Sequence, residues 1–140
     1  MSTTSFMSAP NFLRNVLRAD AMSCLACGLL QVVVPDTMAP LTGLPPALLV
    51  YSGEFLLLYA ALVAFLSTRV PLPRPLVWLL LAGNLGWALA CLLLLVSGSV
   101  VATALGTAYL LVQALTVCVL ADLQFFGLCR QRQTSAKVAL

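Results

Sequence analysis

The sequence contains no histidine and has few charged residues, with seven Lys or Arg and four Asp or Glu among 140. Histidine is the commonest metal ligand and general base, so its absence argues against a dedicated metal site and against hydrolase chemistry. Charged residues make up 8% of the chain, whereas a typical soluble domain has roughly 25%. So few polar groups could not cover the surface of a water-soluble fold. The composition therefore excludes a water-soluble domain, a disordered chain and a nucleic-acid-binding protein.

Hydrophobic residues make up 62% of the chain and gather in four runs. About 20 apolar residues in a helix cross the roughly 30 Å hydrocarbon core of a bilayer, and each run is at least that long. The sequence therefore predicts an all-α membrane protein, a single domain over residues 1–140 built as an antiparallel bundle of four transmembrane helices. The predicted spans are residues 12–34, 47–67, 76–96 and 100–128.

The basic residues divide the connections between these runs into two classes. Every one lies at the start of the first run, between the second and third, or after the fourth, which in a four-span chain is one side of the membrane. The positive-inside rule then places both termini, with their short tails at 1–11 and 131–140, in the cytoplasm. The residues concerned are Arg14, Arg18, Arg69, Arg74, Arg130, Arg132 and Lys137.

Small residues recur at four-residue spacing in the last two runs. Ala82, Gly86 and Ala90 share one helical face in the third run, and Ala102 and Gly106 repeat the pattern at the fourth. Small side chains let helix backbones approach closely, which is a main packing device inside a bilayer. We favour packing within the bundle, and a face for self-association is the alternative.

Glu54 is the most unusual residue of the second run, because it lies about 12 Å along the helix from Pro46 with no basic residue on that side of the membrane. An ionisable group at that depth is costly and is a functional candidate by default. We expect Glu54 to point into the bundle near Tyr51, where it is neutral or hydrogen-bonded. A quinone, a proton or another small ligand would use such a group, and a hydrogen bond between helices is the alternative.

Four amide side chains add to the polar residues of the spans. Asn84 lies at a corresponding depth from the other side, with Gln113 about one turn from its level. Amides at such depths commonly join helices through hydrogen bonds, and we favour that role over ligand contact. Gln31 and Gln124 lie nearer the ends of their spans, from where we expect their side chains to reach water.

Acidic residues near the basic ends of the spans suggest ion pairs. Asp20 and Asp122 are predicted to pair at the interface with arginines such as Arg18 and Arg69.

The first run also contains Cys24 and Cys27, and this spacing brings two thiols to one helix face. A reversible disulfide is one interpretation. Two small packing residues are the other, and we favour it.

Part of the chain resembles a known family. Gly53-Glu54-Phe55-Leu56, the apolar run after it and Thr68-Arg69 resemble the central part of DoxX-like membrane proteins, over about residues 50–90. The resemblance implies a small bacterial four-helix protein, an accessory subunit of a redox or sulfur-metabolism complex, with Glu54 and Arg69 as the positions carried over. The stretch Leu17-Arg18-Ala19-Asp20-Ala21 departs from the family pattern. The chain is also similar in size and span number to inner-membrane proteins of proteobacteria.

Two hypotheses of function follow. The first is a non-enzymatic inner-membrane protein that associates with itself or with a larger membrane complex. The second is a redox-linked, quinone-binding or small-molecule-binding membrane subunit that uses Glu54 with Tyr51, Asn84 and the cysteine pair. No cofactor is predicted under the first hypothesis, and a quinone is the candidate cofactor under the second.

Overall fold

The computed structural model describes residues 9–139, which form helices and no strand. Four of the helices are long and apolar enough to cross a membrane, which confirms the all-α fold with four candidate spans. The helices are α2 (Ala9–Val33), α3 (Pro35–Thr42), α4 (Pro46–Ser67), α5 (Arg74–Val96) and α6 (Ala104–Val138).

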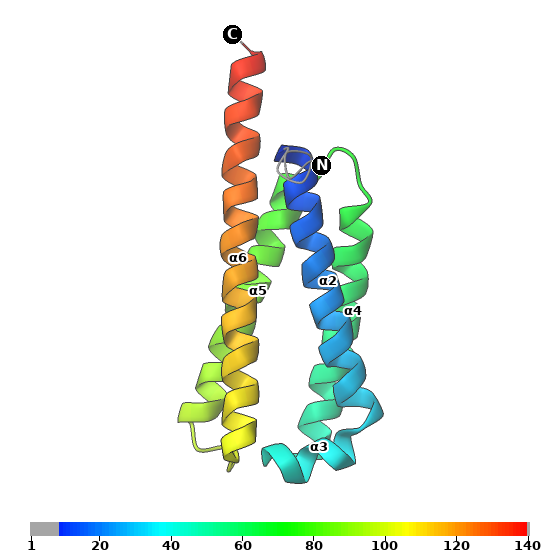
Figure 1. Ribbon diagram of the computed structural model, residues 1–140, viewed down its shortest axis with the longest axis vertical. Coiled ribbons are helices and arrows are strands. Elements are labelled where there is room, and N and C mark those ends of the chain that lie inside the picture. Colours follow the sequence, from blue (N-terminus) through cyan, green and yellow to red (C-terminus); the bar gives the residue numbers. More distant parts are fainter. Residues whose placement is uncertain (1–8, 140) are drawn as a thin grey trace, which may run out of the picture.

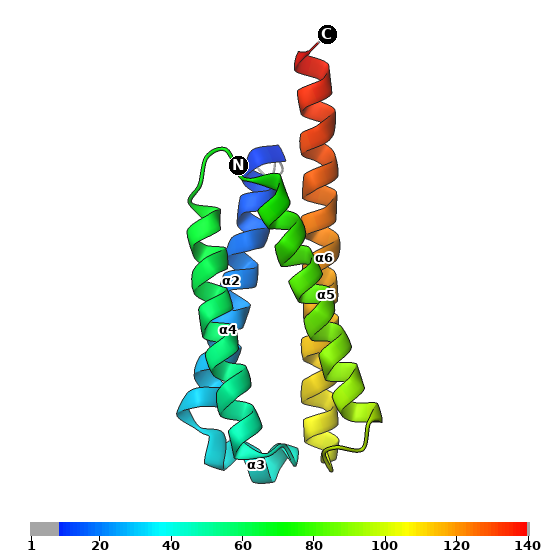
Figure 2. The same ribbon diagram turned by 180° about the vertical axis from the view of Figure 1, so that it is seen from behind.

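The long helices form two antiparallel pairs (Figures 1 and 2). α2 packs along α4 and α5 packs along α6, while α2 against α6 joins the pairs. The α4 and α5 backbones do not pack along each other in this way, and side chains bridge the space between them. α3 lies across the end of the bundle opposite the two chain ends.

The last helix is longer than the sequence predicts. α6 contains 35 residues and is about 50 Å long, so its end projects beyond the other helices (Figure 1). Residues 131–138, expected in a polar tail, are therefore helical. α6 also begins at Ala104 instead of residue 100, because the Thr103 side chain accepts a hydrogen bond from the Gly106 N–H (3.0 Å) and caps the helix. Residues 1–8 of the predicted first tail lie outside the described part.

A short helix, α3, occupies the connection predicted as a loop. Pro35 begins it, and Gly43 ends it with φ 73° while donating its N–H to the Ala39 carbonyl (2.8 Å). Glycine adopts this left-handed conformation without steric cost. The Thr103 N–H donates to the Thr42 carbonyl (3.0 Å), which ties the end of α3 to the start of α6.

Glycines mark the closest helix contacts. A Cβ on Gly28 would lie 2.9 Å from the Gly53 carbonyl oxygen, and one on Gly53 would lie 2.9 Å from the Gly28 oxygen, so α2 and α4 cross where neither has a side chain. Gly106 packs against the Thr42 carbonyl in the same way, while Ala102 before it is half-buried. These crossings hold the first pair of helices together and fasten α6 to α3.

The face of α5 that carries small residues lies elsewhere. Ala82, Gly86 and Ala90 are exposed, and a Cβ on Gly86 would meet nothing within 4 Å. The prediction that this face packs within the bundle is therefore wrong. The four-residue spacing identifies a helix face, but it does not show which neighbour that face contacts.

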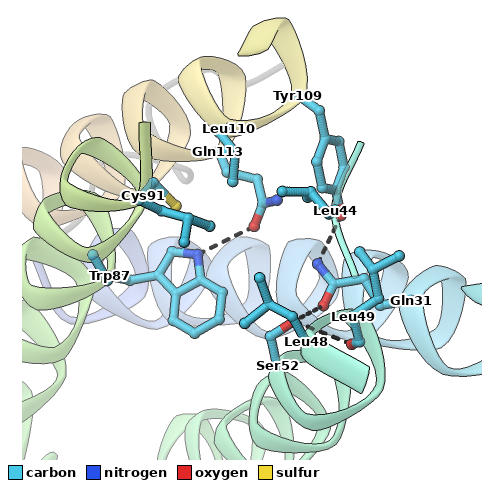
Figure 3. Close-up of a pocket in the computed structure, with 12 residues that line it drawn as sticks. Gln31, Leu44, Leu48, Leu49, Ser52, Trp87, Cys91, Tyr109, Leu110 and Gln113 are labelled. Carbon is cyan, nitrogen blue, oxygen red and sulfur yellow. Dashed lines mark hydrogen bonds between the residues drawn. The ribbon is translucent and has the colours of Figure 1, made fainter. Parts of the chain in front are cut away.

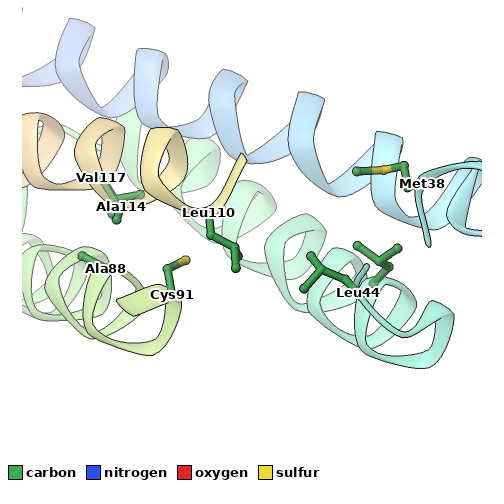
Figure 4. Close-up of a cluster of buried hydrophobic side chains, with 8 residues drawn as sticks. Met38, Leu44, Ala88, Cys91, Leu110, Ala114 and Val117 are labelled. Atoms are coloured by element: carbon green, nitrogen blue, oxygen red, sulfur yellow. The ribbon is translucent and has the colours of Figure 1, made fainter. Parts of the chain in front are cut away.

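The largest cluster of buried apolar side chains lies toward the α3 end (Figure 4). Leu110, Ala114 and Val117 of α6 meet Ala88 and Cys91 of α5 there. Met38 of α3, Leu44 of the α3–α4 connection and Leu49 of α4 complete the cluster. Large apolar side chains on the outer faces of the spans remain exposed, as for Leu58 at 74%, and in a bilayer they would contact lipid.

Replacement of Gly28 by leucine tests the α2–α4 crossing. The new side chain must displace the α4 backbone at Gly53, so we expect Gly28→Leu to lower the free energy of unfolding by about 1–3 kcal/mol. Gly86→Leu adds the same side chain where there is open space and should change it by less than about 0.5 kcal/mol. Denaturation of both variants in detergent micelles provides the comparison. Equal losses in the two would contradict the crossing.

Candidate functional site

A buried carboxylate joins three of the four long helices. Asp20, near the middle of α2, is 0% exposed, and its Oδ2 accepts hydrogen bonds from the Asn84 amide of α5 (2.9 Å) and the Gln124 amide of α6 (2.8 Å). The Cys24 thiol donates to Oδ1 (3.6 Å). Every donor is a neutral group, and within residues 9–139 the carboxylate makes no ion pair. We name Asp20, Asn84, Gln124 and Cys24 the Asp20 cluster.

Two further hydrogen-bonded groups lie among the helices toward α3. The Trp87 indole of α5 donates to Gln113 Oε1 of α6 (3.1 Å). Closer to α3, Gln31 donates to the Tyr109 hydroxyl (2.7 Å) and accepts from the Ser52 hydroxyl (2.7 Å). Polar groups from all four spans therefore meet inside the bundle instead of facing lipid.

An apolar cavity of about 220 Å³ lies among these groups (Figure 3). Its polar lining comes from Gln31, Ser52, Trp87, Tyr109 and Gln113, and a second cavity of about 110 Å³ lies beside it against Trp87 and Gln113. The remaining lining residues of the first cavity are Leu44, Leu48, Leu49, Ala90, Cys91, Leu94 and Leu110. An apolar space with a few convergent polar groups is the usual form of a small-molecule site.

Gln113 presents a free hydrogen-bond donor to this cavity. An indole N–H can only donate, so the Gln113 oxygen must face Trp87 and its NH₂ group must point the other way (Figure 3). That NH₂ group donates to no protein atom in the described part, although the side chain is only 7% exposed. The nitrogen is accessible from the cavity, so a ligand acceptor there would gain a hydrogen bond worth about 1 kcal/mol.

Tyr109 lies one helical turn before Gln113 and supplies a second donor. Its hydroxyl oxygen accepts from Gln31, which leaves the phenolic proton without an acceptor among residues 9–139. Residues four apart share a helix face, so both donors line the same cavity wall. The arrangement favours a ligand with one or more acceptor oxygens, such as carbonyl groups.

The structure places Glu54 and Tyr51 differently from the sequence prediction. Glu54 is exposed on the outer face of α4, and Tyr51 is 72% exposed beside it. The buried side of α4 instead carries Leu49, Gly53 and Leu56. One residue corresponds to about 100° of rotation, so a neighbour of buried Gly53 turns away from the bundle. The prediction that Glu54 points into the bundle is therefore wrong.

The predicted ion pairs also differ from the structure. Asp20 bonds to amides, while Arg18 and Asp122 are exposed. The Arg69 guanidinium stacks over the Phe65 ring at 4.2 Å. Asp20 follows Leu13 and Leu17 at the spacing of one helix face, and this buried stripe places it inside the bundle. Proximity to arginine in the sequence did not reveal that orientation.

The remaining candidate residues fall into two groups. Asn84 (2% exposed) belongs to the Asp20 cluster and Gln113 lines the cavity. Cys24 is buried and Cys27 is half-buried, and both are free thiols. Each of the two cysteines lines the second cavity, where they act as small wall residues.

Sequence reasoning missed the interior roles of Gln31 and Gln124. Both were expected to reach water, yet they are 2% and 0% exposed. On α6, Gln113 and Gln124 continue the three- and four-residue spacing of the buried Leu110, Val117 and Leu120. That register was the signal, because a polar residue within a buried stripe must find its partner inside the bundle.

Removal of the Asp20 carboxylate tests the Asp20 cluster. Asp20→Leu leaves the Asn84 and Gln124 amides without their acceptor, and we expect it to lower the free energy of unfolding by about 2 kcal/mol. Asp20→Asn retains one acceptor oxygen and should lose less. Asp122→Leu, at an exposed position on α6, is the matched control. Unfolding in detergent measures all three, and an Asp20→Leu variant as stable as Asp122→Leu would contradict this role.

Comparison with known proteins assigns no family to the chain. No protein-family model, curated protein or solved structure matches it. The function must therefore be inferred from the residues, the cavity and the candidate membrane spans themselves.

Proposed function

We propose that this membrane protein binds a small lipophilic molecule carrying an acceptor oxygen in the 220 Å³ cavity between its helices. The single observation behind the proposal is the Gln113 amide, which lies nine-tenths buried and directs an unpartnered NH₂ group into an otherwise apolar space. The site differs from the quinone-binding hypothesis centred on Glu54, because the donors come from α6 and Glu54 does not line the cavity.

The shape and chemistry of the cavity favour a substituted ring with carbonyl groups. A cavity of about 150 Å³ accommodates benzene, so 220 Å³ leaves room for a ring with a few small substituents. The Gln113 NH₂ and the Tyr109 hydroxyl would donate to carbonyl oxygens, and the indole of Trp87 forms part of the wall. A benzoquinone has this combination of a flat apolar body and two acceptors. It also dissolves in a bilayer, so it reaches a site among membrane spans.

The fluorescence of Trp87 provides a direct binding assay. Trp78→Phe leaves Trp87 as the sole tryptophan, and Trp78 lies on α5 outside the cavity lining. In this background, in lipid nanodiscs, we expect 2,3-dimethoxy-5-methyl-1,4-benzoquinone to quench the emission with a saturable curve. Gln113→Leu should raise the Kd about fivefold, since a hydrogen bond contributes about 1 kcal/mol.

Gln133→Leu is the matched control for this assay. It removes the same amide from α6 at an exposed position near the chain end, and it should leave the Kd unchanged. Quenching that rises linearly without saturation, or that is the same in Gln113→Leu and the parent, would show that the cavity does not bind the ring.

A second candidate function is association with another membrane protein, and the exposed Glu54 favours it. A carboxyl group on the outer face of a span is costly in lipid, and Glu54 lies between the exposed Tyr51 and Leu58 with no basic partner in the described part. A neighbouring helix with a hydrogen-bond donor would satisfy it. The DoxX-like resemblance, which also carries over Arg69, implies an accessory subunit and so favours the same kind of role.

The mass of the purified protein in a mild detergent tests this association. Glu54→Leu removes the polar group, so we expect loss of the co-purifying partner or of the oligomer, measured by light scattering on a sizing column. Glu54→Gln keeps hydrogen-bonding capacity and should retain most of the complex. Identical masses for the parent and both variants would exclude Glu54 as the contact.

We also propose an inner-membrane location with both termini in the cytoplasm. The start of α2, the end of α6 and the α4–α5 connection lie at one end of the bundle (Figure 1). The basic side chains of α2, α5 and α6 and of that connection gather there, including Arg14, Arg69, Arg74 and Arg130. An excess of Lys and Arg on one side is typical of cytoplasmic loops.

A further inference from the structure

A groove on the outer surface adjoins the proposed binding cavity. It lies between α4 and α5, has a volume of about 400 Å³ and is lined by Phe55, Gly83, Gly86, Trp87 and Ala90. Trp87 and Ala90 also line the cavity. The groove and the cavity therefore adjoin at these two residues, and the groove opens on the side of α5 that would face lipid.

The groove exists because α5 has almost no side chains there. A Cβ on Gly86 would meet nothing within 4 Å, whereas one on Gly83 would lie 3.3 Å from the Tyr59 ring, which bounds the groove at that end. Phe55 of α4 closes the other side by stacking on Trp87, with ring centroids 5.7 Å apart and an angle of 3° between the planes. The indole is held in turn by Gln113. The stacked Phe55 and Trp87 rings, held by the Trp87–Gln113 hydrogen bond, thus separate the groove from the cavity.

The lining of the groove selects its occupant. Every lining side chain is aliphatic or aromatic, apart from the single indole N–H that Gln113 engages, so nothing in the groove would bind a polar headgroup. An apolar groove that faces the bilayer, beside a cavity that contains a hydrogen-bond donor, matches a molecule with a polar ring and one hydrocarbon chain. The ring would occupy the cavity, and the chain would pass beside Trp87 and fill the groove.

We propose that the ligand is a tailed lipophile, a carbonyl-bearing ring whose linear hydrocarbon tail lies along Gly83 and Gly86 and enters the bilayer between α4 and α5. This inference rests on the proposed function, because it assigns a path to the tail of the molecule that the cavity binds. It also explains the row of small residues on the outer face of α5, because these residues would contact the hydrocarbon tail instead of another helix.

The test uses one quinone ring with and without a tail. Trp78→Phe protein in nanodiscs is titrated with 2,3-dimethoxy-5-methyl-1,4-benzoquinone and with the same ring carrying a decyl chain, and Trp87 quenching gives each Kd. We expect Gly86→Leu, which fills the groove, to raise the Kd of the decyl compound at least fivefold. The tail-less compound should change by less than twofold, because the cavity remains intact. Comparison within one nanodisc composition cancels the partitioning of each quinone into lipid.

Ala82→Leu is the matched control, since it adds the same side chain to the same face of α5 outside the groove lining. It should alter neither Kd. If Gly86→Leu leaves the decyl compound unaffected, or weakens both compounds equally, the tail path is wrong while the cavity site stands. If neither quinone quenches Trp87 saturably in the parent, the proposed function and the tail path both fail. Retained binding of the tail-less compound by Gly86→Leu also shows that this variant is folded.

Discussion

The fold depends on the need to satisfy a buried carboxylate inside the bundle. In a bilayer, water cannot hydrogen-bond to groups in the hydrocarbon region, so a polar side chain that turns inward must find its partners on neighbouring helices. Asp20 of α2 finds them in Asn84 of α5 and Gln124 of α6. One side chain thereby links the two helix pairs at a level where apolar packing alone would not specify their register. Interhelical hydrogen bonds of this kind are worth about 1 kcal/mol each, and their directional geometry aligns three helices at once.

The same arrangement leaves α4 less closely connected to α5 and α6. α4 is held to α2 by the glycine crossing at Gly28 and Gly53, and it contributes no side chain to the Asp20 cluster. α4 and α5 meet mainly through bridging side chains, such as the Tyr59 hydroxyl that donates to the Leu80 carbonyl (3.0 Å). A space remains between them at the level of Trp87, and it holds both the cavity and the groove. The proposed ligand site is thus a consequence of how the polar contacts distribute among the helices.

Several features were predictable because they depend on composition and length. Apolar runs of about 20 residues predicted the four spans, and α4 and α5 begin within two residues of their predicted starts because prolines mark them. The helix α3 and the extension of α6 were missed, since short polar segments carry no hydrophobic periodicity. The candidate site was predicted only in part. Asn84 and Gln113 were identified as interior amides, whereas Glu54 was placed inside and Gln124 near water, the reverse of what the structure shows.

The sequence by itself determined the class of protein, the number of spans and the concentration of basic residues at one end. Each of these follows from transfer free energies that add along the chain, independent of which helices touch. The tertiary structure decided which polar residues face one another. A helix can rotate about its axis without changing its composition, so the outward position of Glu54 and the inward position of Asp20 depend on contacts with residues distant in the chain. The free NH₂ group of Gln113 likewise exists only because Trp87, on another helix, engages its oxygen.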